Sequence, residues 1–169
     1  MKTLTLLRHA KAVEAVPGRN DHERPLRDRG QRAARWVGEA SSDRIPDLVL
    51  CSTSVRTRET WAALSRAWNA APPVLYERGL YLASPHQLLQ RIAALEPATR
   101  SVWLIGHNPG IHELARHLAD SAEGGSRFPA LAAHFPTSAR AVFTIEAEDW
   151  AELQTAPITL ADFALAPSD

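Results

Sequence analysis

Two histidines and two arginines stand close to the ends of short apolar runs in this chain. They are Arg8 and His9 after residues 3–7, Arg56 beyond residues 47–51, and His107 after residues 101–105. A neutral imidazole is a good nucleophile toward phosphorus near pH 7, because its pKa lies close to ambient pH. Guanidinium groups match phosphoryl oxygens in geometry and charge, and phosphoryl transfer depends mostly on positioning and charge stabilisation. If the four side chains meet, they have the chemistry to transfer a phosphoryl group.

The apolar runs predict the strands that would position these residues. Strands are expected at residues 3–7, 47–51, 74–76, 101–105 and 139–145, and residues 156–165 could add a last one. Between the strands, apolar residues recur at helical spacing in four segments. These stripes are Ala33, Trp36, Val37 and Ala40; Trp61, Leu64 and Trp68; Leu88, Ile92 and Leu95; and Ile111, Leu114, Ala115 and Leu118.

Local signals predict two helix starts and one long loop. Residues 84–87 have the form of a capping box with proline at the first helical position. Asn108 could cap a later helix, with Pro109 at its first position. Residues 10–30 are rich in turn formers and are therefore expected to form a loop.

Strands that alternate with helices predict a single-domain α/β fold, a three-layer sandwich whose mainly parallel sheet has helices on both faces. In such sheets, ligands bind outside the carboxyl ends of the strands. The residues that follow the apolar runs would then meet at one edge of the sheet. Arg8 and His9 would point to opposite faces of a regular strand, so the chain must already turn there for both to reach one ligand.

Length and composition are consistent with one globular domain over residues 1–169, since 45% of the residues are hydrophobic. The formal net charge is zero, which gives no reason to expect nucleic acid or an anionic membrane as a partner. One cysteine allows no internal disulfide, and the N-terminal segment lacks the features of a signal peptide, so a cytoplasmic protein is expected. Of the 19 Lys and Arg residues, only Lys2 and Lys11 are lysines. Because Ala and Pro are also abundant, compositional bias explains the number of arginines. Only the positions of individual arginines are therefore used as evidence for a binding site.

Four segments of the sequence resemble motifs of the histidine phosphatase superfamily. They are Leu7-Arg8-His9-Ala10, similar to its Arg-His-Gly signature; Arg24-Pro25-Leu26 with Gly30; Ser52-Thr53-Ser54-Val55-Arg56 with Glu59-Thr60; and Gly106-His107-Asn108-Pro109. Each motif alone is weak, but the four occur in the family's order and spacing over residues 4–110. The short chain and the Arg-Pro-Leu segment resemble the SixA-type phosphohistidine phosphatases in particular. The resemblance implies a phosphoglycerate mutase-like fold.

The resemblance also implies a role for each matched residue. His9 would be the nucleophile, and Arg8, Arg56 and His107 would hold the phosphoryl oxygens, with His107 protonated in the complex. Ala10 stands where the family usually has glycine, which suggests that the backbone there needs no positive φ.

Two further positions in this resemblance stay open. Glu77 is a candidate for the general acid, and Asp21 or Glu23 could substitute for it. Arg24 would line the rim of the site as a substrate-binding residue or simply start a helix.

The expected activity is that of a phosphatase that needs no metal or cofactor and forms a phosphohistidine intermediate. An alkoxide leaving group needs a proton from the enzyme, whereas a phosphohistidine P–N bond breaks easily once its own imidazole is protonated. The unclear acid and the open pocket expected of a short chain favour phosphohistidine on a protein as the substrate. A small-molecule phosphomonoesterase on the same scaffold and a phosphoprotein-binding module without turnover are the alternatives.

Other reactive residues are given structural roles. His112 and His117 are five residues apart, which places them about 140° apart around a helix and argues against a zinc site. Cys51 ends an apolar strand and is expected to pack there. A Cys-x5-Arg phosphatase loop would require arginine at position 57, where Thr57 stands. Arg58 is expected at a solvated helix position rather than as a second anion contact.

Overall fold

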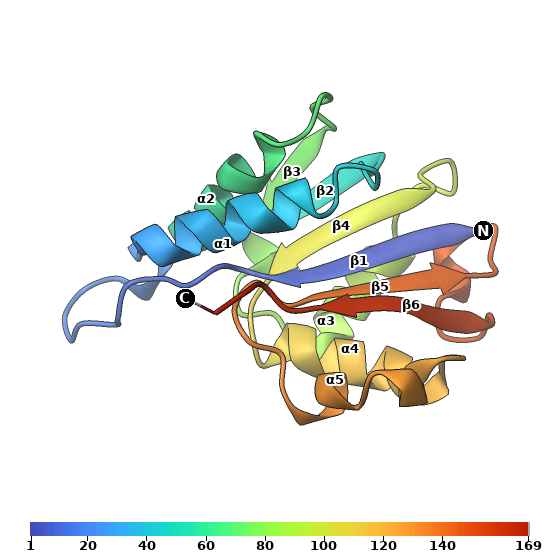
Figure 1. Ribbon diagram of the computed structural model, residues 1–169. Helices are drawn as coiled ribbons and strands as arrows, with labels where there is room; N and C mark the ends of the chain where they lie inside the picture. Colours follow the sequence, from blue (N-terminus) through green and yellow to red (C-terminus); the bar gives the residue numbers. More distant parts are fainter. Residues whose placement is uncertain (169) are drawn as a thin grey trace.

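The computed structural model describes residues 1–168, in which six strands form one mixed sheet with the order β3-β2-β4-β1-β5-β6 (Figure 1). The strands are β1 Lys2–Arg8, β2 Leu48–Ser52, β3 Val74–Glu77, β4 Ser101–Gly106, β5 Arg140–Ile145 and β6 Ile158–Ala164. The first four run parallel to one another, and β5 and β6 add an antiparallel edge. The predicted strand positions and the mainly parallel sheet are therefore confirmed.

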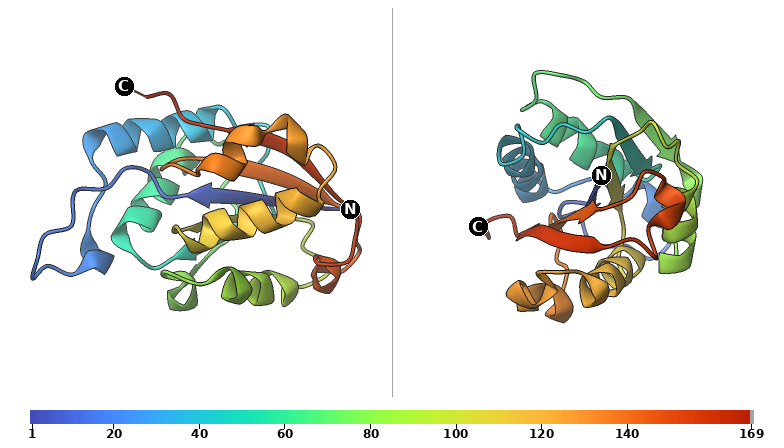
Figure 2. Two further views of the ribbon diagram at one scale, coloured as in Figure 1. Left: turned by 90° about the horizontal axis from the view of Figure 1, so that it is seen from below. Right: turned by 90° about the vertical axis from the view of Figure 1, so that its right-hand side faces the viewer.

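Helices cover both faces of the sheet, as the alternating pattern predicts (Figures 1 and 2). On one face lie α1 Asp28–Glu39 and α2 Val55–Ser65, and on the other lie α3 Pro85–Ala93, α4 Gly110–Ser121 and α5 Pro129–Ala133. Four short 3-10 helices complete the described structure: η1 Asp21–Glu23, η2 Arg78–Leu80, η3 Gly125–Arg127 and η4 Trp150–Glu152. Within residues 1–168, no helix is both long and apolar enough to cross a bilayer.

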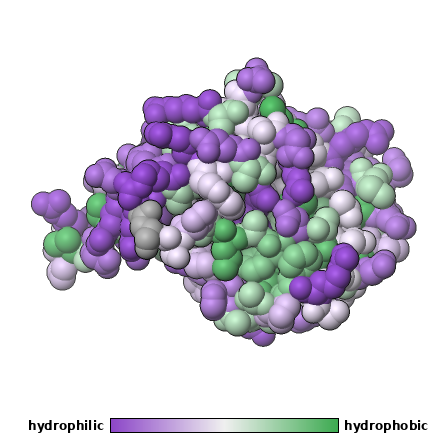
Figure 3. All heavy atoms as spheres, in the orientation of Figure 1, coloured by the Kyte–Doolittle hydropathy of each residue, from purple (hydrophilic) through white to green (hydrophobic). Residues whose placement is uncertain are grey.

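Alternation along the strands divides the core into two layers, because successive side chains point to opposite faces of the sheet. On β4, Leu104 packs in the cluster beneath α3 and α4, whereas Trp103 and Ile105 pack with the side chains of α2. Figure 3 shows hydrophilic side chains over α1, while hydrophobic side chains reach the surface beside β6 and α5. The sheet thus holds the ends of β1, β2 and β4 between two packed layers.

Two glycines set the position of α1 against its neighbours. A Cβ atom at Gly38 would collide with the backbone of Leu64 in α2, and one at Gly30 would collide with the carbonyl oxygen of Lys11. This close packing makes Gly30, Ala34, Val37 and Gly38 the buried face of α1. The predicted stripe is therefore only partly right, since Ala40 is exposed.

The predicted helix starts have different outcomes. The capping box at Ser84 and Gln87 is confirmed, and Pro85 opens α3. The predicted cap at Asn108 is wrong, because α4 begins at Gly110 without a side-chain cap. The amide of Asn108 instead donates a hydrogen bond of 2.8 Å to the carbonyl oxygen of Phe135, which ties the end of β4 to the segment before β5.

Candidate active site

The register of the sheet brings the carboxyl ends of three strands to one level. Arg8 of β1 pairs with Gly106 of β4, and Cys51 of β2 pairs with Ile105 of the same strand. A cavity of about 340 Å³ opens at this edge. Its lining residues are Arg8, His9, Lys11, Ala12, Glu14, Asp21, Arg24, Arg56, Leu82, His107, Asn108 and Thr137. The structure therefore gathers Arg8, His9, Arg56 and His107 in one place.

His9 is buried at the bottom of this cavity, with 7% of its surface exposed. Its Nδ1 lies 2.7 Å from the carbonyl oxygen of Ala10, which can only accept, so Nδ1 carries the proton. Nε2 therefore holds the ring's in-plane lone pair, which accepts a hydrogen bond of 3.3 Å from Nε of Arg56. Burial lowers the pKa of His9 to about 3, and the nearby charge of Arg56 also lowers it. His9 is thus a neutral imidazole whose unprotonated nitrogen is Nε2.

The backbone around His9 is fixed by its neighbours. The N–H of His9 donates to the carbonyl oxygen of Gly106 over 3.1 Å, and that of Ala10 donates to Oγ1 of Thr60 over 2.9 Å. Ala10 is not among the residues with positive φ, which confirms that glycine is not required there. The turn after β1 therefore accommodates alanine and still directs both Arg8 and His9 into the cavity.

Arg56 lies in the first turn of α2, which Ser54 caps by accepting a hydrogen bond from the N–H of Thr57. The arginine is only 2% exposed, and each guanidinium nitrogen has a partner. Nε donates to His9, Nη1 donates to the carbonyl oxygen of Asp21 over 2.8 Å, and Nη2 donates to its carboxylate over 3.0 Å. The planar guanidinium is thereby held in one orientation beside Nε2 of His9.

Asp21 is the residue that orients Arg56. Its carboxylate accepts hydrogen bonds from the hydroxyl of Tyr81, from Arg24 over 2.9 Å and from Arg56. The hydrogen bond from Tyr81, together with those from the arginines, lowers the pKa of Asp21 to about 2. Asp21 is therefore ionised at neutral pH and cannot donate a proton there. Tyr81 carries no signal in the sequence motifs, and its contact with Asp21 becomes visible only in the structure.

His107 faces His9 across the cavity, with 5.3 Å between the two ring centroids. Its Nε2 lies 2.8 Å from Oγ of Ser52, at the end of β2. Burial, with a further contribution from the charge of Arg56, lowers the pKa of His107 to about 3. Within residues 1–168, the buried Nδ1 of His107 and Nε of Arg8 have no hydrogen-bond partner. An oxyanion that reached both nitrogens would supply these missing partners.

The charges around the cavity favour an anion. Its cationic side chains are Arg8, Lys11, Arg24 and Arg56, and its anionic side chains are Glu14 and Asp21. Four cations and two anions give the lining a net charge of +2, opposite to that of a phosphoryl dianion. Arg24 contributes to this lining and also supports Asp21, so the structure places it at the site rather than only before a helix.

Glu77 is not brought into the cavity. It ends β3 opposite Ser52, but both carboxylate oxygens accept hydrogen bonds from Arg91 of α3, at distances of 2.7 to 3.1 Å. Glu23 is exposed and lines a neighbouring pocket instead. Cys51 is buried, as expected, and burial raises the pKa of its thiol to about 12. None of these three side chains lies in position to act on a group at His9.

Comparison with known proteins gives a consistent result. The model of the histidine phosphatase superfamily (branch 1) matches residues 4–81. The uncharacterized protein Rv1276c of Mycobacterium tuberculosis is 34% identical over 93% of this chain and 98% of its own length. The structure of SixA from Agrobacterium tumefaciens is 35% identical, with a TM-score of 0.80 and 98% of each chain covered. SixA from Nakamurella multipartitia is 30% identical, with a TM-score of 0.84 over 99% of this chain and 97% of that chain.

Proposed function

This chain belongs to the histidine phosphatase superfamily and resembles its SixA-type members, and we propose that this phosphatase acts on phosphohistidine carried by a protein. The observation that carries the proposal is the state of His9, a buried neutral imidazole whose Nε2 lone pair is directed toward Arg56. A binding module would need the cationic groups but would have no use for a nucleophile prepared in this way.

The proposed reaction has two steps. Nε2 of His9 attacks the phosphorus, the P–N bond of the substrate breaks, and the released imidazole keeps its electron pair and a proton. Water then attacks the phosphorus bound to Nε2 of His9, the P–N bond breaks, and inorganic phosphate and free His9 are released. Arg8, Arg56 and His107 stabilise the charge on the three transferring oxygens in both steps. No metal or cofactor takes part in this proposal.

His107 changes its charge in this scheme. Burial keeps it neutral in the free protein, because its pKa lies at about 3. A phosphoryl group with two negative charges would raise that pKa by direct attraction. In the proposed scheme this rise brings the pKa near the ambient pH, so that His107 takes up a proton with the substrate and donates to a phosphoryl oxygen.

The carboxylates near the site favour phosphohistidine over phosphate esters. Asp21 is ionised and held by three donors, and Glu77 is paired with Arg91. Neither can readily supply the proton that an alkoxide leaving group requires. An imidazole leaving group is protonated on its own ring and depends less on the enzyme. The cavity also lies open beside the exposed side chain of Leu82, which allows a residue on a protein surface to enter.

A comparison of substrates tests the proposal. Wild type should hydrolyse a phosphohistidine protein with a much higher kcat/KM than an alkyl phosphate ester, and His9→Ala should abolish both activities. The control His86→Ala changes an exposed residue of α3 and should retain full activity. Higher activity toward the alkyl ester would support the phosphomonoesterase alternative, and activity that persists in His9→Ala would exclude the proposed nucleophile.

A further inference from the structure

A second groove opens beside the phosphate cavity, and we propose that it binds an acidic segment flanking the phosphorylated histidine of the protein substrate. The inference rests on the function proposed above and states where the remainder of the substrate lies. The groove has a volume of about 390 Å³. Its walls are formed by Lys11, Arg29, Ala33, Pro136, Thr137 and residues 165–168.

The groove is continuous with the phosphate cavity. Lys11 and Thr137 line both spaces, so one begins where the other ends. The wall that contains Thr137 is fixed to the nucleophile, because the N–H of Ser138 donates to the carbonyl oxygens of Arg8 and His9 over 3.2 and 3.1 Å. A substrate segment in the groove would therefore be held at a defined position relative to His9.

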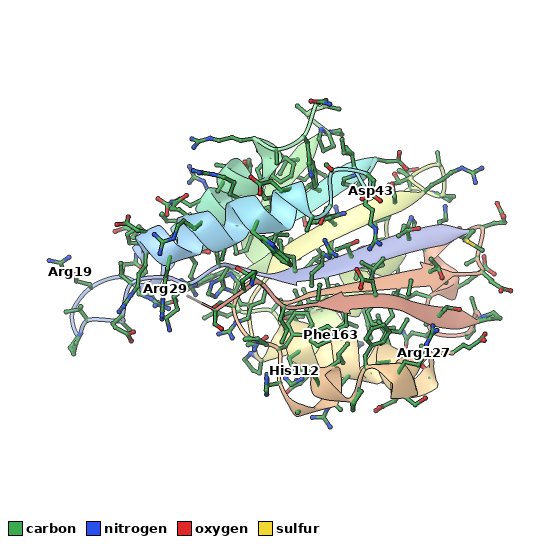
Figure 4. The ribbon with its side chains drawn as sticks, in the orientation of Figure 1. Arg19, Arg29, Asp43, His112, Arg127 and Phe163 are labelled. Carbon is green, nitrogen blue, oxygen red and sulfur yellow. The ribbon has the colours of Figure 1, made fainter. Side chains whose placement is uncertain are left out.

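The wall formed by Lys11 and Arg29 is tied to the segment that follows β1. The carbonyl oxygen of Lys11 accepts a hydrogen bond of 2.9 Å from the N–H of Arg27, just before α1. Arg29 follows in the first turn of α1, close to the C-terminal segment of the chain (Figure 4). The walls that contain Thr137 and Lys11 are thus anchored to residues next to His9, and residues 165–168 after β6 complete the groove.

The charge of the groove indicates what it binds. Lys11 and Arg29 have no ion-pair or hydrogen-bond partner for their side chains among residues 1–168, and no acidic residue occurs among the described lining residues. Three other arginines near the site are ion-paired: Arg24 and Arg56 with Asp21, and Arg27 with Glu14. Two unpaired cations on one groove favour carboxylates as the binding partner.

The shape and the remaining walls favour a polypeptide. Pro136, Pro167 and the half-exposed Leu165 provide apolar surface along the groove, against which the backbone and side-chain stems of a peptide can pack. None of the described lining residues is aromatic, so a nucleotide base would find no ring to stack on. An acidic peptide segment fits both the apolar and the cationic parts of the groove.

Peptide pairs of matched sequence test this inference with the full chain. Each pair contains phosphohistidine and differs only in a run of glutamates or glutamines, placed on one or the other side of the modified residue. At low ionic strength, wild type should prefer the glutamate peptide of one pair by about fivefold in kcat/KM, the size expected for partly exposed charge pairs. Arg29→Glu should remove this preference. Arg35→Glu, an exposed residue of α1 outside the groove, should keep it.

The same variants separate the groove from the phosphate site. Turnover of 4-nitrophenyl phosphate should be the same in wild type, Arg29→Glu and Arg35→Glu, because this ester occupies only the phosphate cavity. Equal turnover of the glutamate and glutamine peptides by wild type, or a preference that survives Arg29→Glu, would overturn the inference. Hydrolysis of 4-nitrophenyl phosphate without hydrolysis of any peptide would refute the phosphohistidine function itself, and with it the role of the groove.

Discussion

Two buried neutral histidines make the stability of this protein depend on pH. His9 and His107 are 7% and 3% exposed, and each has a pKa of about 3 in the fold, against about 6.5 in an unfolded chain. Because the folded values are the lower ones, the unfolded chain binds more protons between pH 6.5 and 3, and stability is lost as the pH falls through this window. When the pH falls from about 7 to about 5.5, the free energy of unfolding should decrease by about 1.2 kcal/mol for each of the two histidines.

Urea denaturation of the wild type and of His9→Gln at these two pH values measures this contribution. The loss of unfolding free energy between them should be about 1.2 kcal/mol smaller in His9→Gln, because glutamine does not titrate. His86→Gln removes an exposed histidine of α3 and should reproduce the wild-type difference. If His9→Gln lost as much stability as wild type on acidification, His9 could not be the neutral buried group described above.

Three substitutions probe the supports of the site. Arg56→Lys should lower kcat/KM by at least about 100-fold in a phosphatase assay, because a single ammonium group cannot contact His9 and Asp21 at once as the planar guanidinium does. Near-normal activity of this variant would contradict the role of Arg56. Tyr81→Phe should lower kcat by about two- to tenfold, because Asp21 loses a hydrogen-bond donor and then orients Arg56 less well. Unchanged kinetics would show that Tyr81 has no positioning role. Gly30→Ala should destabilise the fold by about 1–3 kcal/mol in urea denaturation, since its Cβ would collide with Lys11, and a stable variant would refute that contact.

Much of this site could be predicted because strand ends in a parallel sheet are easily read from the sequence. Residues 3–7 alternate and then run apolar, residues 102–105 are continuously apolar, and the register places the ends of both strands level with the end of β2. The rule that ligands bind at the carboxyl ends of strands then brings the histidines together without knowledge of any contact. The hydrophobic pattern and the four motifs were therefore sufficient to predict that Arg8, His9 and His107 lie at one edge of the sheet.

The supports of the site could not be predicted in the same way. Asp21 meets Arg56 across 35 residues and Tyr81 across 60, through side chains that follow no periodic pattern. The prediction for Glu77 placed it correctly at a strand end, but Arg91 of α3 takes up its carboxylate with a bidentate contact. Such pairings depend on rotamers and on the packing of neighbouring helices, which local sequence does not encode.

In the proposed mechanism, His9 carries the phosphoryl group during turnover. The most direct test is to mix the protein with a radiolabelled phosphohistidine protein, stop the reaction under alkaline denaturing conditions and locate the label by mass spectrometry. Phosphate should be found on His9, should be stable to base and lost in acid, and should be absent from His9→Ala. Label that resists acid, or that persists on the enzyme in His9→Ala, would contradict it.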